Sequence, residues 1–222
     1  MKLELITVKT ADDVELDGAL YLPDGSSADW RKPILAVHGL TWNFYRGPMR
    51  WLPKYFIDAG FPCLSLNMRD HDLDKPKDFE LSHHDLRAGI DFLTSKLGKA
   101  PVIVGHGYAN NKIACYAAQS GDDRIETYVL ATLGSVKKYR PDIWDAVLGG
   151  AQRMRGRALV VQGAIDELIE AKPRAEELIS AAKGCRVDVS YLAGGNHYFH
   201  GKEVELGSAI VAWLGKEHEA RG

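Results

Sequence analysis

Apolar and polar residues alternate along residues 3–8 and again along 14–22, with a polar stretch at 10–13 between the two runs. A period of two is typical of strands that bury one face, so the pattern predicts an antiparallel hairpin. Turn-forming residues at 23–27 then break the pattern. Residues 34–37 follow as a short, continuous apolar run, which is typical of a strand buried on both faces.

From this point buried strands and amphipathic helices alternate along the chain. Apolar runs predict strands at 62–66, 102–104, 127–132, 158–162 and 187–192, and helical spacing predicts helices at 52–59, 82–97, 110–119, 173–183 and 204–214. Ser82 and Asp85 match a capping box at the start of one helix, and Gly98 marks its end. The alternation predicts an α/β fold with a mostly parallel, doubly wound sheet that follows an antiparallel N-terminal hairpin.

The length of 222 residues fits a single domain spanning residues 1–222. One irregular insert interrupts the alternation, at about 135–156, where a minimal lid would lie over the carboxyl ends of the strands. Trp144 and its helically spaced neighbours give this insert an apolar face with basic residues around it. Such a lid would suit an apolar substrate that carries a carboxylate or phosphate, although basic residues on a short helix are more often simply solvated.

Composition excludes several classes of partner. The 28 basic and 30 acidic side chains nearly balance, so no field that attracts nucleic acid is expected. The three widely spaced cysteines form no C-x-x-C pair and indicate buried, reduced thiols. No signal peptide and no long apolar segment is found, so we expect a cytoplasmic protein with no membrane contact. No dinucleotide-binding, phosphate-loop or metal motif is present, and no cofactor is expected. The oligomeric state is open.

Four short motifs follow predicted strands. They are His38-Gly39, the turn Gly105-His106-Gly107-Tyr108-Ala109, the segment from Gln162 to Asp166, and Gly195-Asn196-His197. Their number and order resemble the α/β-hydrolase superfamily, in which a nucleophile elbow of the form G-x-S-x-G precedes an acidic residue and then a histidine. The resemblance extends from residue 3 to residue 214, and the elbow is most similar to that of small esterases and thioesterases.

The resemblance implies a role for each motif. His197 matches the general base, and Asp166 matches the carboxylate that orients it. Leu40, Thr41 and Tyr108 match the segments that form an oxyanion hole through backbone N–H groups. The substrate pocket is expected to include His38, Trp42, Phe44, His106 and Trp144. For His106 a packed position inside the fold is favoured over a catalytic role.

Gly107 stands where the superfamily has its nucleophilic serine. The nucleophile of such an elbow has a strained backbone, which glycine adopts without cost, so the turn can persist while the attacking oxygen is missing. Ala109 keeps the small side chain that close packing of strand and helix requires. An acyl-enzyme cannot form at this position.

The segment from Arg69 to Asp74 contains residue types that bind metals, yet its spacing matches no defined site, and no metal is expected. The neighbouring histidines at 83 and 84 are interpreted as part of a capped, solvated helix start.

Three interpretations of function remain open at this level. The chain is a hydrolase of serine ester or thioester hydrolase descent, acting on a small, partly apolar carbonyl substrate, with Gly107 either natural or engineered. Alternatively, the His197–Asp166 dyad works without covalent catalysis, as in a lyase, a decarboxylase or a hydrolase that uses direct water attack. The third interpretation is a protein that binds a small ligand without catalysis.

Overall fold

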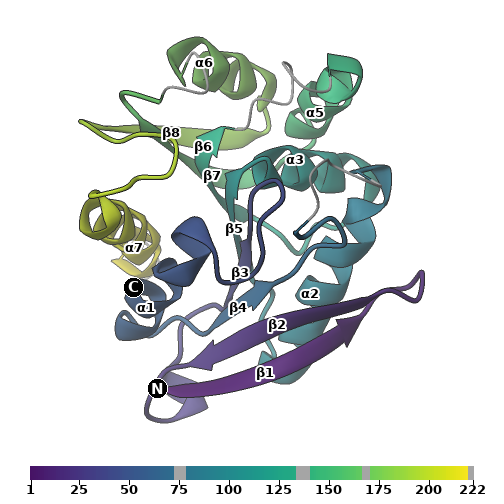
Figure 1. Cartoon of the computed structure of the whole chain (residues 1–222), viewed down its shortest axis with the longest axis vertical. Coiled ribbons are helices and arrows are strands. Elements are labelled where there is room, and N and C mark those ends of the chain that lie inside the picture. The colour runs from purple at the N-terminus through teal and green to yellow at the C-terminus, as the bar shows by residue number, and fades with distance from the viewer. Residues whose placement is uncertain (73–78, 134–140, 167–170, 220–222) are drawn as a thin grey trace.

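A twisted, eight-stranded sheet runs through the centre of the molecule in this computed structural model (Figure 1). The structure describes residues 1–72, 79–133, 141–166 and 171–219, without the side chains of 171–175 and 217–219. Within these residues the strand order is β1-β2-β4-β3-β5-β6-β7-β8. The strands are β1 (Lys2–Lys9), β2 (Glu15–Leu22), β3 (Ile34–Val37), β4 (Cys63–Leu66), β5 (Val102–Gly107), β6 (Thr127–Leu133), β7 (Gly156–Gly163) and β8 (Cys185–Leu192).

The register confirms the predicted mixture of antiparallel and parallel pairing. β1 pairs with β2 as a hairpin in which Lys2 lies opposite Leu22, and β2 pairs antiparallel with β4. Every later pair, from β4–β3 to β7–β8, is parallel. The carboxyl ends of β3, β5, β7 and β8 therefore meet at one edge of the sheet, which is where such folds bind ligands.

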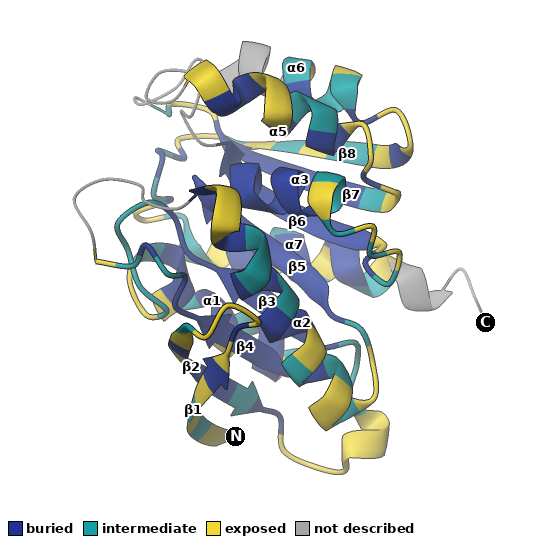
Figure 2. Ribbon diagram, turned by 90° about the vertical axis from the view of Figure 1, so that its right-hand side faces the viewer, coloured by how far each residue is buried: buried dark blue, intermediate teal, exposed yellow. Residues whose placement is uncertain are grey.

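Helices cover both faces of the sheet (Figure 1). α1 (Leu52–Asp58) and α7 (Glu203–Glu219) lie together on one face. The other face carries α2 (Ser82–Leu97), α3 (Ala109–Gln119), α5 (Trp144–Ala151) and α6 (Ala171–Ala181). Each helix layer packs over its own apolar cluster, and Figure 2 shows the central strands β3 to β6 as buried.

One expectation about these helices is wrong. Ser82 does not cap α2, because its hydroxyl donates to the carbonyl of Phe79 and the fully buried Asp85 carboxylate binds Arg69 instead. The predicted lid insert is described only in part, and its role as a lid stays a prediction. The described part forms a 3₁₀ turn at Pro141–Ile143 and α5, whose apolar stripe packs against α3. Residues 135–140 lie outside the described residues.

The three cysteines, Cys63, Cys115 and Cys185, are all buried and free, as predicted. Burial raises the pKa of Cys115 to about 12 and that of Cys185 to about 11, so both thiols stay protonated at neutral pH. None of the helices in the described residues is long and apolar enough to cross a membrane.

Candidate active site

The strand-to-helix turn at Gly107 has the backbone geometry of a nucleophile elbow. β5 ends at Gly107, which has a φ of 59°, and Tyr108 follows as the residue that precedes α3. A Cβ on Gly105 would lie 2.5 Å from the Ile113 side chain and 2.6 Å from Asn110 Oδ1, so only glycine fits there. The turn therefore requires glycine at position 105 for lack of space, whereas at position 107 glycine matters for its positive φ.

His197 and Asp166 form a buried pair beside this turn. His197 Nδ1 lies 3.0 Å from Asp166 Oδ2 and 3.2 Å from Oδ1. A carboxylate only accepts hydrogen bonds, so in the neutral ring Nδ1 carries the proton and Nε2 does not. An ideal Cβ on Gly107 would lie 3.4 Å from His197 Nε2, which is ordinary van der Waals contact. His197 Nε2 thus faces the place where a side chain at position 107 would begin.

Backbone contacts between two loops bring the pair together. The N–H of Ile165 donates to the carbonyl of Gly195 over 3.0 Å, and that of Ala164 donates to Leu192 over 3.0 Å. Gly163 makes this approach possible, because a Cβ there would lie only 2.4 Å from the Gly195 oxygen. The loops after β7 and β8 are consequently fixed to each other, and with them Asp166 and His197.

His106 supports His197 from below rather than lining a pocket, which corrects one expectation. Its ring is 2% exposed, and Nε2 donates to the carbonyl of His197 over 2.9 Å. Burial lowers the pKa of His106 to about 3, so the ring is neutral near pH 7. Trp42 stacks over it, with 5.4 Å between ring centroids, and also stacks on Tyr198 at 5.0 Å. Trp42 and Tyr198 are half-buried and form an aromatic wall next to His197.

His38 is also wrongly placed in the predicted pocket. It is 1% exposed, donates from Nδ1 to the carbonyl of Gly39 and accepts the N–H of Met68 at Nε2. Burial lowers the pKa of His38 to about 4, which keeps this ring neutral as well. It links the loops that follow β3 and β4 and has no exposed surface for a substrate.

Phe44 and Trp144 have their main contacts with other parts of the fold. Phe44 lines a groove along β1 and β2, and its backbone N–H donates to Asn67 after β4 over 2.8 Å. Trp144 is 7% exposed in α5, and its indole N–H donates to Glu177 of α6 over 3.0 Å. The place of both residues in the substrate pocket stays a prediction.

The loop after β3 passes directly against the elbow. A Cβ on Gly39 would lie 3.2 Å from the carbonyl oxygen and 3.3 Å from Nδ1 of His106. Leu40 and Thr41 follow, and Thr41 has a φ of 59°, a backbone conformation that is strained for a residue with a branched Cβ. The loop that carries Leu40 and Thr41 therefore begins next to the turn that carries Tyr108. The role of these three residues as an oxyanion hole stays a prediction.

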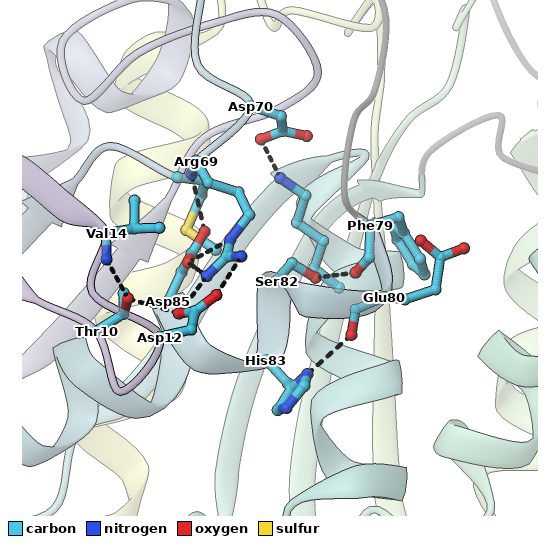
Figure 3. A network of polar contacts seen from close by, with 12 residues as sticks. Thr10, Asp12, Val14, Arg69, Asp70, Phe79, Glu80, Ser82, His83 and Asp85 are labelled. Carbon is cyan, nitrogen blue, oxygen red and sulfur yellow. Dashed lines mark hydrogen bonds and ion pairs between the residues drawn. The ribbon is translucent and has the colours of Figure 1, made fainter.

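The acidic segment after β4 forms ion pairs inside the fold (Figure 3). Arg69 donates to Asp85 from its backbone N–H and its side chain, and both terminal nitrogens donate to Asp12. Asp70 pairs with Lys112 of α3, and both side chains are 1% exposed. Asp74 lies outside the described residues. Arg69 and Asp70 therefore join the hairpin, α2 and α3.

Sequence reasoning missed two residues near the dyad. Tyr198 directly follows His197, and nothing in the pattern indicates that it stacks on Trp42. Gln162 is the residue before the last one of β7, is fully buried, and donates from Nε2 to Asp166 Oδ2 over 2.9 Å. Its position near the end of the strand, four residues before Asp166, is the signal that could have identified it.

Comparison with solved structures supports the fold. Dienelactone hydrolase from Anabaena variabilis superposes with a TM-score of 0.79 at 17% identity, covering 96% of each chain. Est1E from Butyrivibrio proteoclasticus has a TM-score of 0.79 at 14% identity over 97% of this chain and 99% of that one. An α/β serine hydrolase homologue from Coxiella burnetii has a TM-score of 0.77 at 16% identity over 96% and 98%.

Neither a protein-family model nor a curated protein sequence matches the chain. The structural matches span nearly the whole length of both partners. The chain has the α/β-hydrolase fold, as the resemblance in its sequence implied. At sequence identities this low, structural similarity establishes the fold only. The similar structures themselves are esterases and other hydrolases.

Proposed function

We propose that this protein is an enzyme of the ester or thioester hydrolase type in which the His197–Asp166 dyad activates water directly. One observation carries the proposal: His197 Nε2 faces the position of a missing nucleophile side chain, 3.4 Å from an ideal Cβ on Gly107, while Nδ1 binds Asp166. A water molecule held at that position would occupy the place of the serine oxygen.

The chemistry needs a base and a site for the developing negative charge. The water oxygen attacks the carbonyl carbon while one water proton passes to His197 Nε2, and Asp166 stabilises the imidazolium that forms. Backbone N–H groups of the Leu40–Thr41 segment and of Tyr108 would bind the oxyanion. The tetrahedral intermediate then expels the alkoxide or thiolate, which takes the proton from His197. No covalent bond forms between the substrate and the enzyme.

Trp42 and Tyr198 favour a small, partly apolar carbonyl substrate, because their stacked rings border the dyad. A related observation comes from Est1E, whose solved structure with ferulic acid superposes on this chain with a TM-score of 0.79 at 13% identity. We expect no nucleic-acid or membrane partner and no cofactor for this reaction.

The test is hydrolysis of a panel of p-nitrophenyl esters and acyl thioesters by the protein as it stands. Turnover should start without a burst and without an acyl adduct in intact-mass spectra, and His197→Ala should abolish it. Gly107→Ser should introduce both a burst and an adduct, because the new Cβ meets no clash. Hydrolysis that survives His197→Ala would refute the proposed mechanism.

A second candidate is a binding protein that kept the fold without catalysis, which Gly107 itself favours. Fragment binding followed by ligand-observed NMR separates the two. A binding protein should take up small carboxylates or esters with equal affinity in the wild type and in His197→Ala while neither form turns them over. Turnover by the wild type would exclude this candidate.

A further inference from the structure

The side-chain amide of Gln162 bridges the end of β6 to the dyad. Its Oε1 accepts the backbone N–H of Leu133 over 3.1 Å, and its Nε2 donates to Asp166 Oδ2 over 2.9 Å. Asp166 Oδ2 is also the oxygen that lies 3.0 Å from His197 Nδ1. One carboxylate oxygen thus receives a donor from the catalytic ring and a donor from the sheet.

The orientation of this amide is determined by its partners. A backbone N–H can only donate, so the group that faces Leu133 must be the oxygen. A carboxylate can only accept, so the group that faces Asp166 must be the nitrogen. Gln162 is fully buried, and exchanging oxygen and nitrogen would break both hydrogen bonds at once. The donor to Asp166 is therefore fixed.

We infer that Gln162 is a positioning residue for the dyad. Its amide holds the Asp166 carboxylate where both oxygens remain within reach of His197 Nδ1, which keeps the imidazole in the tautomer that leaves Nε2 as the base. Asp166 follows β7 on a loop rather than in a strand, and the Gln162 amide connects its carboxylate directly to that strand.

The amide is the group best suited to this position. A leucine or methionine would leave the Leu133 N–H and Asp166 Oδ2 without the partner that Gln162 provides. A glutamate would place a second carboxylate against Asp166, and two adjacent carboxylates resist ionising together. Gln162 supplies an acceptor to one side and a neutral donor to the other.

The test compares Gln162→Met, which keeps the length and volume of the side chain, with the control Gln119→Met at an exposed position on α3. Nitrogen chemical shifts of the His197 ring report its tautomer without any substrate. The wild type and the control should show the Nδ1–H form. Gln162→Met should show a mixture of both neutral tautomers. An unchanged tautomer in folded Gln162→Met would overturn the inference.

A measurement on the wild type covers the case in which Gln162→Met does not fold. The Gln162 amide protons and the His197 Nδ1 proton share one acceptor, so they should give a nuclear Overhauser contact. Its absence would also overturn the inference. The consequence for catalysis rests on the proposed function: kcat should fall by about 10- to 100-fold in Gln162→Met with little change in KM. An inert wild type would defeat that function and leave the tautomer result intact.

Discussion

At the scale of single residues, the buried histidines separate into two kinds. His38 and His106 hold loops as neutral hydrogen-bonding groups, and burial lowers the pKa of His38 to about 4 and of His106 to about 3. His197 instead binds a carboxylate and faces the elbow. The same residue type thus serves as a fixed connector twice and as a candidate base once, and only the surrounding contacts distinguish these uses.

Acid should destabilise the protein through these connectors. In the unfolded chain a histidine titrates near a pKa of about 6.5, above the folded values, so the unfolded state binds more protons as the pH falls from about 6.5 toward 4. Each such ring lowers the free energy of unfolding by up to about 1.4 kcal/mol per pH unit in that window. Urea unfolding midpoints measured between pH 7.5 and about 4.5 should show the loss.

The matched variants for this prediction are His106→Gln and His200→Gln. A glutamine amide can still donate to the His197 carbonyl but takes up no proton, so His106→Gln should lose less stability on acidification than the wild type. His200 is exposed, and its replacement should leave the wild-type slope unchanged. Equal slopes for all three proteins would contradict the assignment.

At the scale of elements, α5 packs unusually close to α3. A Cβ on Gly150 would lie 2.0 Å from the carbonyl oxygen of Ala114, whereas one on Gly149 would have nothing within 4 Å. Because the two helices lie so close, Val147 and Ala151 of α5 are fully buried in the apolar cluster on this face of the sheet. The apolar spacing within the predicted lid insert therefore supplies the face by which α5 packs against α3.

Two adjacent glycine substitutions test this contact. Gly150→Ala should lower the free energy of unfolding by about 1–3 kcal/mol, because the new methyl group must push α5 away from α3. Gly149→Ala should be neutral or stabilising by up to about 1 kcal/mol, because alanine favours the helix at no steric cost. Urea denaturation of both variants gives the comparison. Similar values for the two would show that α5 is not held at this distance.

Most elements could be predicted because strands buried on both faces appear in the sequence as apolar runs. β3 matches its predicted bounds, while β5 and β7 extend to Gly107 and Gly163, since glycines at strand ends give no hydrophobic signal. The capping box failed for another reason. The Asp85 carboxylate accepts a hydrogen bond from Arg69, which lies 16 residues earlier in the chain. No local sequence pattern indicates a partner at that separation.

At the scale of the whole molecule, ion pairs connect elements that are far apart in the sequence. Arg69 joins Asp12 in the hairpin turn to Asp85 in α2, and Lys112 joins α3 to Asp70 after β4. Removing one member of a buried pair leaves an uncompensated charge, which is far more costly than removing both. The pairs therefore specify how the hairpin, α2 and α3 fit together.

The Lys112–Asp70 pair offers a direct test. Lys112→Met should lower the free energy of unfolding by about 3–5 kcal/mol, and the double variant Lys112→Met/Asp70→Leu should recover much of that loss. Lys54→Met removes an exposed pair with Asp58 and should change little. Chemical denaturation measures all three. A double variant no more stable than Lys112→Met would show that the buried charge is not the cause.

The candidate site was predictable only in part, because it too depends on contacts between residues that are distant in the sequence. Strand order brings the motifs that end β3, β5, β7 and β8 to one edge, so Gly107, Asp166 and His197 could be expected to meet. The aromatic positions were harder to predict. Phe44 lines a groove along β1 and β2 and Trp144 binds Glu177 of α6, and both contacts depend on residues that lie far away in the sequence, which a single sequence does not reveal.

The glycine at the elbow also decides how the protein responds to reactive inhibitors. Organophosphates, sulfonyl fluorides and β-lactones inactivate serine hydrolases by bonding to the nucleophilic oxygen, and residue 107 has none to offer. Profiling a proteome with such reagents would therefore pass over this elbow, whatever the protein does in the cell. For the proposed function, the suitable reagents are reversible ligands that mimic the oxyanion, such as boronic acids hydrated in solution.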